Sequence, residues 1–186
     1  MRPGQGARAI TREELEKAAA FYLERYASSR ENLRRVLLRR VAKAARGDET
    51  AAEPGRAEVE ALIARYLAAG LLDDRRYAEA KAAALARGGG SRFQIRGKLM
   101  QKGVGRDEIN EAIAALDGNE GSERAAACAL IRRKRLGPYR PSADRAAFRH
   151  KDLAALARAG FALDLAQELL RAPSVEALEQ MARERV

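Results

Sequence analysis

Residues 62–116 read LIARYLAAGLLDDRRYAEAKAAALARGGGSRFQIRGKLMQKGVGRDEINEAIAAL, and this stretch decides the fold. Apolar residues recur in it at the three- and four-residue spacing of helices. Glycine interrupts the pattern at three places, where helices commonly stop: Gly70, Gly88–Gly90 and Gly103. Asp73 or Asp74 is expected to cap the first helix after Gly70, and Ser91 to cap the next one. The stretch therefore predicts three short helices joined by tight turns.

Two adjacent motifs in this stretch resemble a known family. GLLDDRRYA (70–78) followed by SRFQIRGKLMQKGV (91–104) is similar to the middle module of the bacterial RecX regulatory proteins, where G-L-L-D-D-x-R-[FY]-A leads into a basic R-x-x-I-R-x-x-L-x-x-K-G segment. The matching positions are Gly70, Leu71, Leu72, Asp73, Asp74, Arg76, Tyr77 and Ala78, then Arg92, Ile95, Arg96, Leu99, Lys102 and Gly103. The likeness is close over residues 62–116 and fainter on either side.

The rest of the chain also predicts helices. Two capping boxes, Thr11 with Glu14 and Ser28 with Glu31, indicate helix starts near Arg12 and Arg30. Residues 42–56 lose the apolar periodicity and gain Gly, Asp, Glu and Pro, which favours a surface loop or an extended helix end. All five prolines are expected outside helix interiors. Further helices are expected over 57–69, 123–135, 145–158 and 163–170, with a short one after Pro173.

An internal repeat organises these helices. SRENLRRVLLRR (29–40) aligns with SRFQIRGKLMQK (91–102), so that Leu33 matches Ile95 and Leu37 matches Leu99. We expect an all-α fold of three tandem three-helix modules, helix-turn-helix-like, and the resemblance implies an elongated, curved array. The expected parts are a flexible basic tail (1–10), a first module (11–72) with a loop at about 42–56, a second module (73–118) and a third with a C-terminal helix (119–186).

Composition points to an anionic partner. The chain has 36 Lys and Arg against 26 Asp and Glu, a net charge of +10, which favours nucleic acid first, then an acidic protein surface or a membrane. One cysteine and one histidine exclude a disulfide framework and the usual zinc clusters. With no targeting segment or apolar span visible, we expect a cytoplasmic monomer without cofactor or metal.

The positive charges gather in three windows, each at or near the middle helix of a module. Residues 80–106 and 124–143 contain no acid, and residues 28–47 contain only Glu31. Single cations usually solvate helices, but three such windows in register predict a discontinuous cationic stripe. The candidate contact residues are Arg34, Arg35, Arg39, Arg40, Arg92, Arg96, Lys98, Lys102, Arg132, Arg133 and Arg135.

Other roles have weaker support in the sequence. Asn32 and Gln94 are the only base-reading candidates on the middle helices, which is little for sequence-specific recognition. Tyr139 can stack on a base or close a loop. His150 lacks a nucleophile partner by motif, and Cys128 is expected in the core. We therefore expect no enzyme.

The resemblance implies a specific partner. Similar proteins dock in the helical groove of the RecA filament on single-stranded DNA and inhibit its ATPase, strand exchange and extension. The expected partners are thus the RecA filament and single-stranded DNA, with duplex DNA as a further candidate. Two alternatives remain open: a general nucleic-acid-binding or architectural protein independent of RecA, and an adaptor for an acidic protein.

Overall fold

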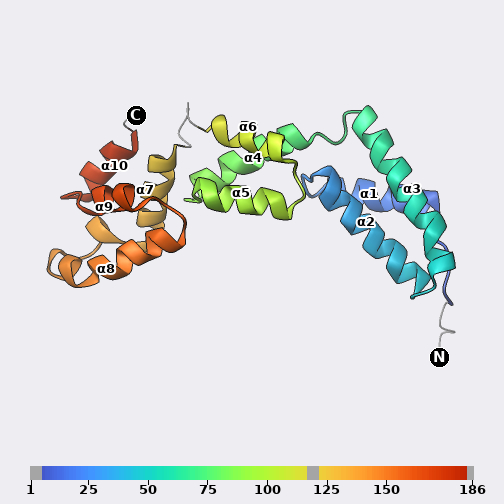
Figure 1. Cartoon of the computed structure of the whole chain (residues 1–186), viewed down its shortest axis with the longest axis horizontal. Helices are drawn as coiled ribbons and strands as arrows, with labels where there is room; N and C mark the ends of the chain where they lie inside the picture. The colour runs from blue at the N-terminus through green and yellow to red at the C-terminus, as the bar shows by residue number, and fades with distance from the viewer. Residues whose placement is uncertain (1–5, 117–121, 184–186) are drawn as a thin grey trace. The chain divides into compact units, whose positions relative to one another are not determined.

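The computed structural model describes residues 6–116 and 122–183, and over these residues the protein is helical throughout (Figure 1). It forms a tandem array of three-helix modules, as predicted. The helices are α1 (Arg12–Leu23), α2 (Arg30–Ala45), α3 (Glu49–Ala68), α4 (Asp74–Arg87), α5 (Arg92–Gln101), α6 (Arg106–Ala114), α7 (Glu123–Lys134), α8 (Ser142–Arg158), α9 (Leu163–Leu170) and α10 (Val175–Arg183), with a 3₁₀ turn at Gly137–Tyr139.

The helices group into two compact units. One comprises the chain up to Tyr77 together with Lys102–Gly105, and the other comprises Ala78–Gln101 and the chain from Arg106 onward. Helices α4 to α10 thus belong largely to one unit, and the module bounds expected at residues 73 and 119 stay a prediction.

The first unit has a core built by α1, α2 and α3. Leu15 of α1, Leu33 and Leu37 of α2 and Val59 and Leu62 of α3 are at most 1% exposed. Each such side chain contributes about 1.5–3 kcal/mol when it leaves water. Helix–helix packing around this cluster therefore fixes the face that α2 turns to the solvent.

The start of α1 is the predicted capping box. The Thr11 hydroxyl accepts from the Glu14 amide at 3.3 Å, and the Glu14 carboxylate accepts from the Thr11 amide at 2.9 Å. Just before it, the Arg8 amide donates to the Ala44 carbonyl at 3.2 Å, and Ile10 packs on the core. The flexible tail predicted over residues 1–10 is therefore wrong for residues 8–10, while residues 1–5 lie outside the described residues.

The second predicted capping box is wrong by one residue. Ser29, not Ser28, is the N-cap of α2 and accepts from the Asn32 amide at 3.2 Å, and the predicted start at Arg30 is confirmed. Ser28 accepts from the side-chain amide of Asn32 at 2.8 Å. Either of the two adjacent serines could be the N-cap in the sequence, and in the structure it is the buried Ser29 whose hydroxyl reaches a backbone amide.

Of the two expectations for residues 42–56, the surface loop is wrong and the extended helix end is confirmed, because α2 continues to Ala45 and α3 already begins at Glu49. Only a short turn separates them, with Arg46 in the left-handed region at φ 49° and Asp48 capping α3. Pro54 lies inside α3, against the prediction for all prolines.

Gly55 explains why this helical segment lacked an apolar pattern. A Cβ atom at Gly55 would lie 2.8 Å from Ile10 Cγ2 and 2.9 Å from Val41 Cγ1, so α3 approaches α2 closely at this point. Ala52 is 3% exposed on the same side. The contact face is made of small residues, which carry little hydrophobic signal although they are buried.

Helices α4, α5 and α6 follow the predicted order. Asp73 caps α4 by accepting from the Arg76 amide at 2.9 Å, and Gly70 and Gly103 adopt φ values of 68° and 70° where helices were expected to stop. Ile95 and Leu99 of α5 are buried, as are Ile109 and Ile113 of α6 and the alanines 78, 82 and 86 of α4. The alanine face lets these short helices pack closely.

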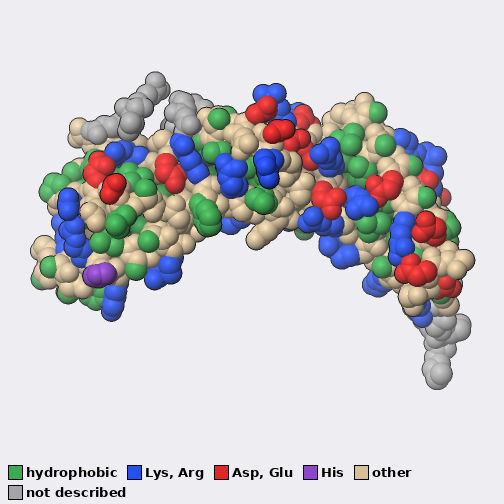
Figure 2. All heavy atoms as spheres, viewed as in Figure 1, with side chains coloured by type: hydrophobic (Ala, Val, Ile, Leu, Met, Phe, Trp, Pro, Cys, Tyr) green, Lys and Arg blue, Asp and Glu red, His purple; other side chains and the backbone are tan. Residues whose placement is uncertain are grey.

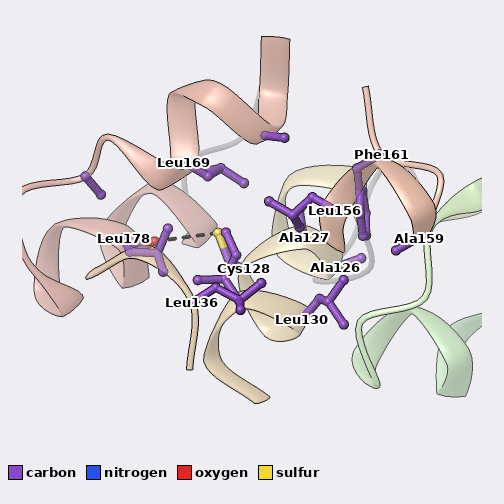
Figure 3. Packing of buried hydrophobic residues seen from close by; sticks show 13 residues of the cluster. Ala126, Ala127, Cys128, Leu130, Leu136, Leu156, Ala159, Phe161, Leu169 and Leu178 are labelled. Atoms are coloured by element: carbon purple, nitrogen blue, oxygen red, sulfur yellow. Dashed lines mark hydrogen bonds between the residues drawn. The ribbon is translucent and has the colours of Figure 1, made fainter. Parts of the chain in front are cut away.

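Helices α7 to α10 enclose a second core, whose labelled members include Leu130, Leu136, Leu156 and Leu178 (Figure 3). Cys128 lies among them, and its Sγ points to the Leu178 carbonyl at 3.7 Å. The predicted helices at 123–135, 145–158 and 163–170 correspond to α7, α8 and α9. The sequence DGNEGS (117–122) also predicts a turn before α7, and its residues 117–121 lie outside the described residues.

Candidate polyanion-binding surfaces

A row of cations runs along the exposed face of α2. Arg35, Arg39 and Lys43 are spaced four residues apart and are exposed, while Leu37 and Val41 lie on the buried side. Figure 2 shows Lys and Arg side chains at the surface over α2. We call Arg35, Arg39 and Lys43 the α2 row.

Arg40 stands beside the row, at the edge of a shallow hollow. The hollow is lined by further cations, together with Phe21 and Glu14: Arg8, Lys17, Lys43 and Arg46. Arg8 and Lys17 are paired with Glu14 and Glu13 at 2.5 and 2.6 Å. Arg40, Lys43 and Arg46 have no such partner among the described residues, so they keep their charge available.

The other predicted cations of α2 differ in how far they are neutralised. Arg34 pairs with Glu60 of α3 at 2.6 Å and lies 3.8 Å from Glu31, so it joins two helices. Arg35 pairs with Glu31 one turn earlier at 2.7 Å. Arg39 has no acidic side chain within 4.0 Å in the part of the chain that the structure describes. Arg39 and Arg40 are therefore the strongest phosphate-contact candidates of this helix.

On α5 the predicted cations do not form one face. Arg96 and Lys98 are both exposed, but two residues of helix separate them by about 200° around the axis, so they flank the helix on opposite sides. Arg96 donates to Asn110 Oδ1 at 2.7 Å, a neutral partner. Between the flanks, the outward face carries Phe93, Gly97 and Met100, which sequence reasoning passed over.

Arg92 and Lys102, at the two ends of this window, have local contacts. Arg92 Nε lies 3.7 Å from Glu123 Oε2, and Lys102 Nζ donates to Asn32 Oδ1 at 3.3 Å. Arg92 is therefore part of a structural joint, whereas Lys102 extends the exposed cations near the start of α2 within the first unit.

The third set lies at the end of α7 and not on the middle helix α8. Arg132 and Arg133 are in the last turn, where positive charge is favourable beside the free carbonyls, and Arg135 is the C-cap at φ 52°. All three are exposed, and Arg133 donates to the Gly88 carbonyl. Helix-end stabilisation accounts for part of this cluster, so it is the weakest of the three.

A repeated joint holds the beginnings of α2 and α5. The cap Ser29 donates to the Lys102 carbonyl, and the Arg30 amide donates to Asp74 Oδ1 at 2.7 Å. Asp74 is 7% exposed, and its carboxylate also lies 3.2 Å from Arg30 Nε. A carboxylate at this position stabilises the positive end of the helix dipole.

The same contacts recur in the second unit. The cap Ser91 donates to the Ala159 carbonyl, and the Arg92 amide donates to Glu123 Oε2 at 3.0 Å. Burial raises the pKa of Glu123, against the opposing hydrogen bond and charge of Arg92. Asp74 is the first residue of α4, and Glu123 is the first residue of α7. An acid at the start of one module thus caps the middle helix of the module before it, α2 or α5. The only sequence signal was the Ser-Arg pair shared by the two repeats.

Of the residues that the sequence raised for catalysis or stacking, Cys128 is buried, Tyr139 is half-buried and His150 is exposed. Burial raises the pKa of the Cys128 thiol to about 11, which keeps it protonated and unreactive at neutral pH. His150 is exposed on α8. Tyr139 is half-buried, with its hydroxyl 3.4 Å from Glu179, as expected for a residue that closes a loop.

Among the described residues, no group of three His, Cys, Asp or Glu side chains could hold a metal ion. None of the described helices has both the length and the apolar character that a membrane span requires.

Comparison with known proteins agrees with the motif positions. The family model for the second three-helix domain of RecX matches residues 73–113. Regulatory protein RecX of Myxococcus xanthus (strain DK1622) is 42% identical over 157 residues, covering 84% of this chain and 83% of that protein. No solved structure matches the chain.

Proposed function

Because the chain belongs to the RecX family of regulatory proteins, we propose that it acts without catalysis, by binding the RecA filament on single-stranded DNA and inhibiting its ATPase, strand exchange and extension. The observation that carries the proposal beyond family membership is the α2 row with Arg40, an exposed set of cations of which Arg39, Arg40 and Lys43 lack acidic partners within the described residues.

Phosphate binding by such a surface is additive and sensitive to salt. Each phosphate neutralised on a single strand contributes about 0.7 to the slope of log affinity against log salt. A filament around single-stranded DNA presents phosphates along its length together with protein surface. Several weak contacts from exposed arginines therefore add up on this target, while no individual contact has to be strong.

The direct test is a titration of the protein into RecA, single-stranded DNA and ATP. We expect ATP hydrolysis to fall at ratios approaching one protein per few RecA protomers, and strand exchange to fall with it. Hydrolysis that stays unchanged at stoichiometric amounts would contradict the proposal.

Charge-reversed variants show whether the α2 cations are responsible. Arg39→Glu with Arg40→Glu is expected to weaken inhibition, because both side chains are exposed and hold no structural ion pair. Arg171→Glu with Arg183→Glu is the matched control: it changes the net charge equally at exposed positions outside the three basic windows. Equal loss in both variants would indicate a nonspecific charge effect.

The alternative is a general nucleic-acid-binding protein that does not depend on RecA. The α2 row favours this alternative to the extent that it is purely cationic and offers nothing specific to a protein partner. The two functions differ in affinity: the RecA regulator binds the filament more tightly than bare single-stranded DNA at the same salt concentration, whereas the general binder does not.

A further inference from the structure

The outward face of α5 is apolar. Phe93 is 73% exposed and Met100 is 62% exposed, and both belong to the same side of the helix as Gly97. We propose that this face, the α5 patch (Phe93, Gly97 and Met100), docks into an apolar groove with an acidic rim on a protein partner. The inference rests on the proposed function, in which that partner is a RecA protomer, and it assigns to α5 a protein contact in place of a phosphate contact.

The spacing of the patch is that of a helix seated in a groove. Phe93, Gly97 and Met100 occupy positions i, i+4 and i+7, which place three successive contacts along one side of a helix. Ile95 and Leu99, on the opposite side, are at most 1% exposed and hold α5 to its own module. The helix therefore uses one face for the fold and leaves a second apolar face uncovered.

Comparison with the equivalent helix α2 shows where the outward faces of the two helices differ. The repeat aligns Phe93 with Glu31, Gly97 with Arg35 and Met100 with Leu38, which packs half-buried against the core of its own unit, while the buried positions stay aliphatic in both helices. A half-buried and an exposed charge on α2 thus correspond to an aromatic ring and a glycine on α5. Since the modules have the same helical architecture, the fold does not require an aromatic ring or a glycine at these two positions.

Gly97 gives the patch its shape. A Cβ atom built on Gly97 would meet no other atom within 4 Å, so the glycine is not required by packing inside the protein. In mid-helix a glycine is unfavourable compared with alanine. Its effect is to let the surface of a partner approach the α5 backbone between the Phe93 and Met100 side chains.

Phe93 is positioned before any partner binds. A Cβ atom on Gly160 would lie 2.9 Å from both Cβ and Cδ1 of Phe93, which shows that the base of the ring rests on the Gly160 turn in the same unit. A side chain that is already held loses little freedom on binding. Exposed aromatic and methionine side chains of this kind are typical centres of protein interfaces.

The charges around the patch define its partner. Arg96 and Lys98 flank it on either side, and α5 itself carries no acid. An apolar centre with cationic flanks is complementary to an apolar groove with an acidic rim. Single-stranded DNA also attracts cations and can stack a base on Phe93. Base stacking does not, however, account for the exposed Met100 or for a glycine at position 97.

Two variants and two targets test the assignment. Phe93→Ala with Met100→Ala removes the side chains from the surface, and Gly97→Gln places a side chain between them at a position where a Cβ atom meets no other atom within 4 Å. Both variants are expected to keep the helical content of the parent protein, and Gly97→Gln to melt at the same or a slightly higher temperature because it replaces a glycine inside a helix. We expect each to bind the RecA filament at least tenfold more weakly and to bind bare single-stranded DNA within twofold of the parent protein.

The outcomes separate the possible errors. A parallel tenfold loss on bare DNA for the Phe93/Met100 variant, with Gly97→Gln unaffected, would make the patch a base-stacking site and overturn the inference. Filament binding that is unchanged in both variants overturns the inference while the proposed function stands. A parent protein that does not bind the filament at all refutes the proposed function, and the inference fails with it.

Discussion

Asp152 is a carboxylate buried in the core of α7 to α10, where it is 2% exposed. Its Oδ2 accepts from the Gly137 amide and from Arg140 Nε, both at 2.8 Å, and its Oδ1 accepts from the second Arg140 nitrogen at 2.7 Å. Burial alone would raise the pKa of Asp152, but these hydrogen bonds and the charge of Arg140 outweigh it and hold the pKa below its usual value. At the scale of single residues, this carboxylate fixes the 3₁₀ turn to α8.

Asp152→Asn is expected to destabilise the protein in a pH-dependent way. Because the pKa is lower in the folded than in the unfolded state, the carboxylate stabilises the fold above the unfolded pKa, and this contribution is lost as pH falls through the folded value. Losing hydrogen bonds to a charged group costs about 1.5–3 kcal/mol near neutral pH. Urea unfolding of both proteins near neutral pH and at about pH 3 measures the difference, which should shrink in acid. A difference that is independent of pH would show that the charge of Asp152 is unimportant.

At the scale of helices, the beginnings of α2 and α5 depend on an acid supplied by a later helix. Asp74 is the first residue of α4, yet it caps α2, which lies 44 residues earlier in the chain. Such a contact cannot be found by searching for caps close to a helix start. The sequence motif marked Asp73 and Asp74 as a pair, and the structure divides their work between two helices.

Asp74→Ala is expected to lower the free energy of unfolding by about 1–2 kcal/mol, since it removes a cap and leaves the Arg30 amide without its carboxylate. The denaturation midpoint measures the effect. Glu13→Ala is the control: Glu13 forms an exposed pair with Lys17, and its loss should cost about 0.3–0.5 kcal/mol. Equal effects of the two substitutions would show that the joint does not stabilise α2.

The existence and order of most helices followed from periodicity and caps, as at Thr11 and at Ser91. The helical segment around Pro54 did not, because its buried face consists of small residues such as Gly55, whose contacts come from a distant helix. The cationic windows alone do not show which of their side chains share one surface. A window lists charges in chain order, whereas the helical rotation of about 100° per residue sends Arg96 and Lys98 to opposite flanks.

At the scale of the whole molecule, the net charge of +10 predicts association with polyanions that weakens as salt increases. Substitution of the α2 cations measures how much of this salt dependence comes from one surface. Arg39→Glu with Arg40→Glu is expected to lower the slope of log affinity against log salt on single-stranded DNA by about 1.4, or roughly 0.7 for each lost phosphate contact. Fluorescence titrations at several salt concentrations measure the slope. An unchanged slope would place the phosphate contacts elsewhere.

The joint that begins with Ser29 and is repeated at Ser91 does not recur at α8, whose first turn follows Pro141 without a side-chain cap. The middle helices α2 and α5 thus begin with hydrogen bonds to an acid of a later helix, and α8 begins without a side-chain cap. The start of α8 consequently depends on its own sequence and packing, whereas the starts of α2 and α5 can form fully only after a helix further along the chain has folded against them.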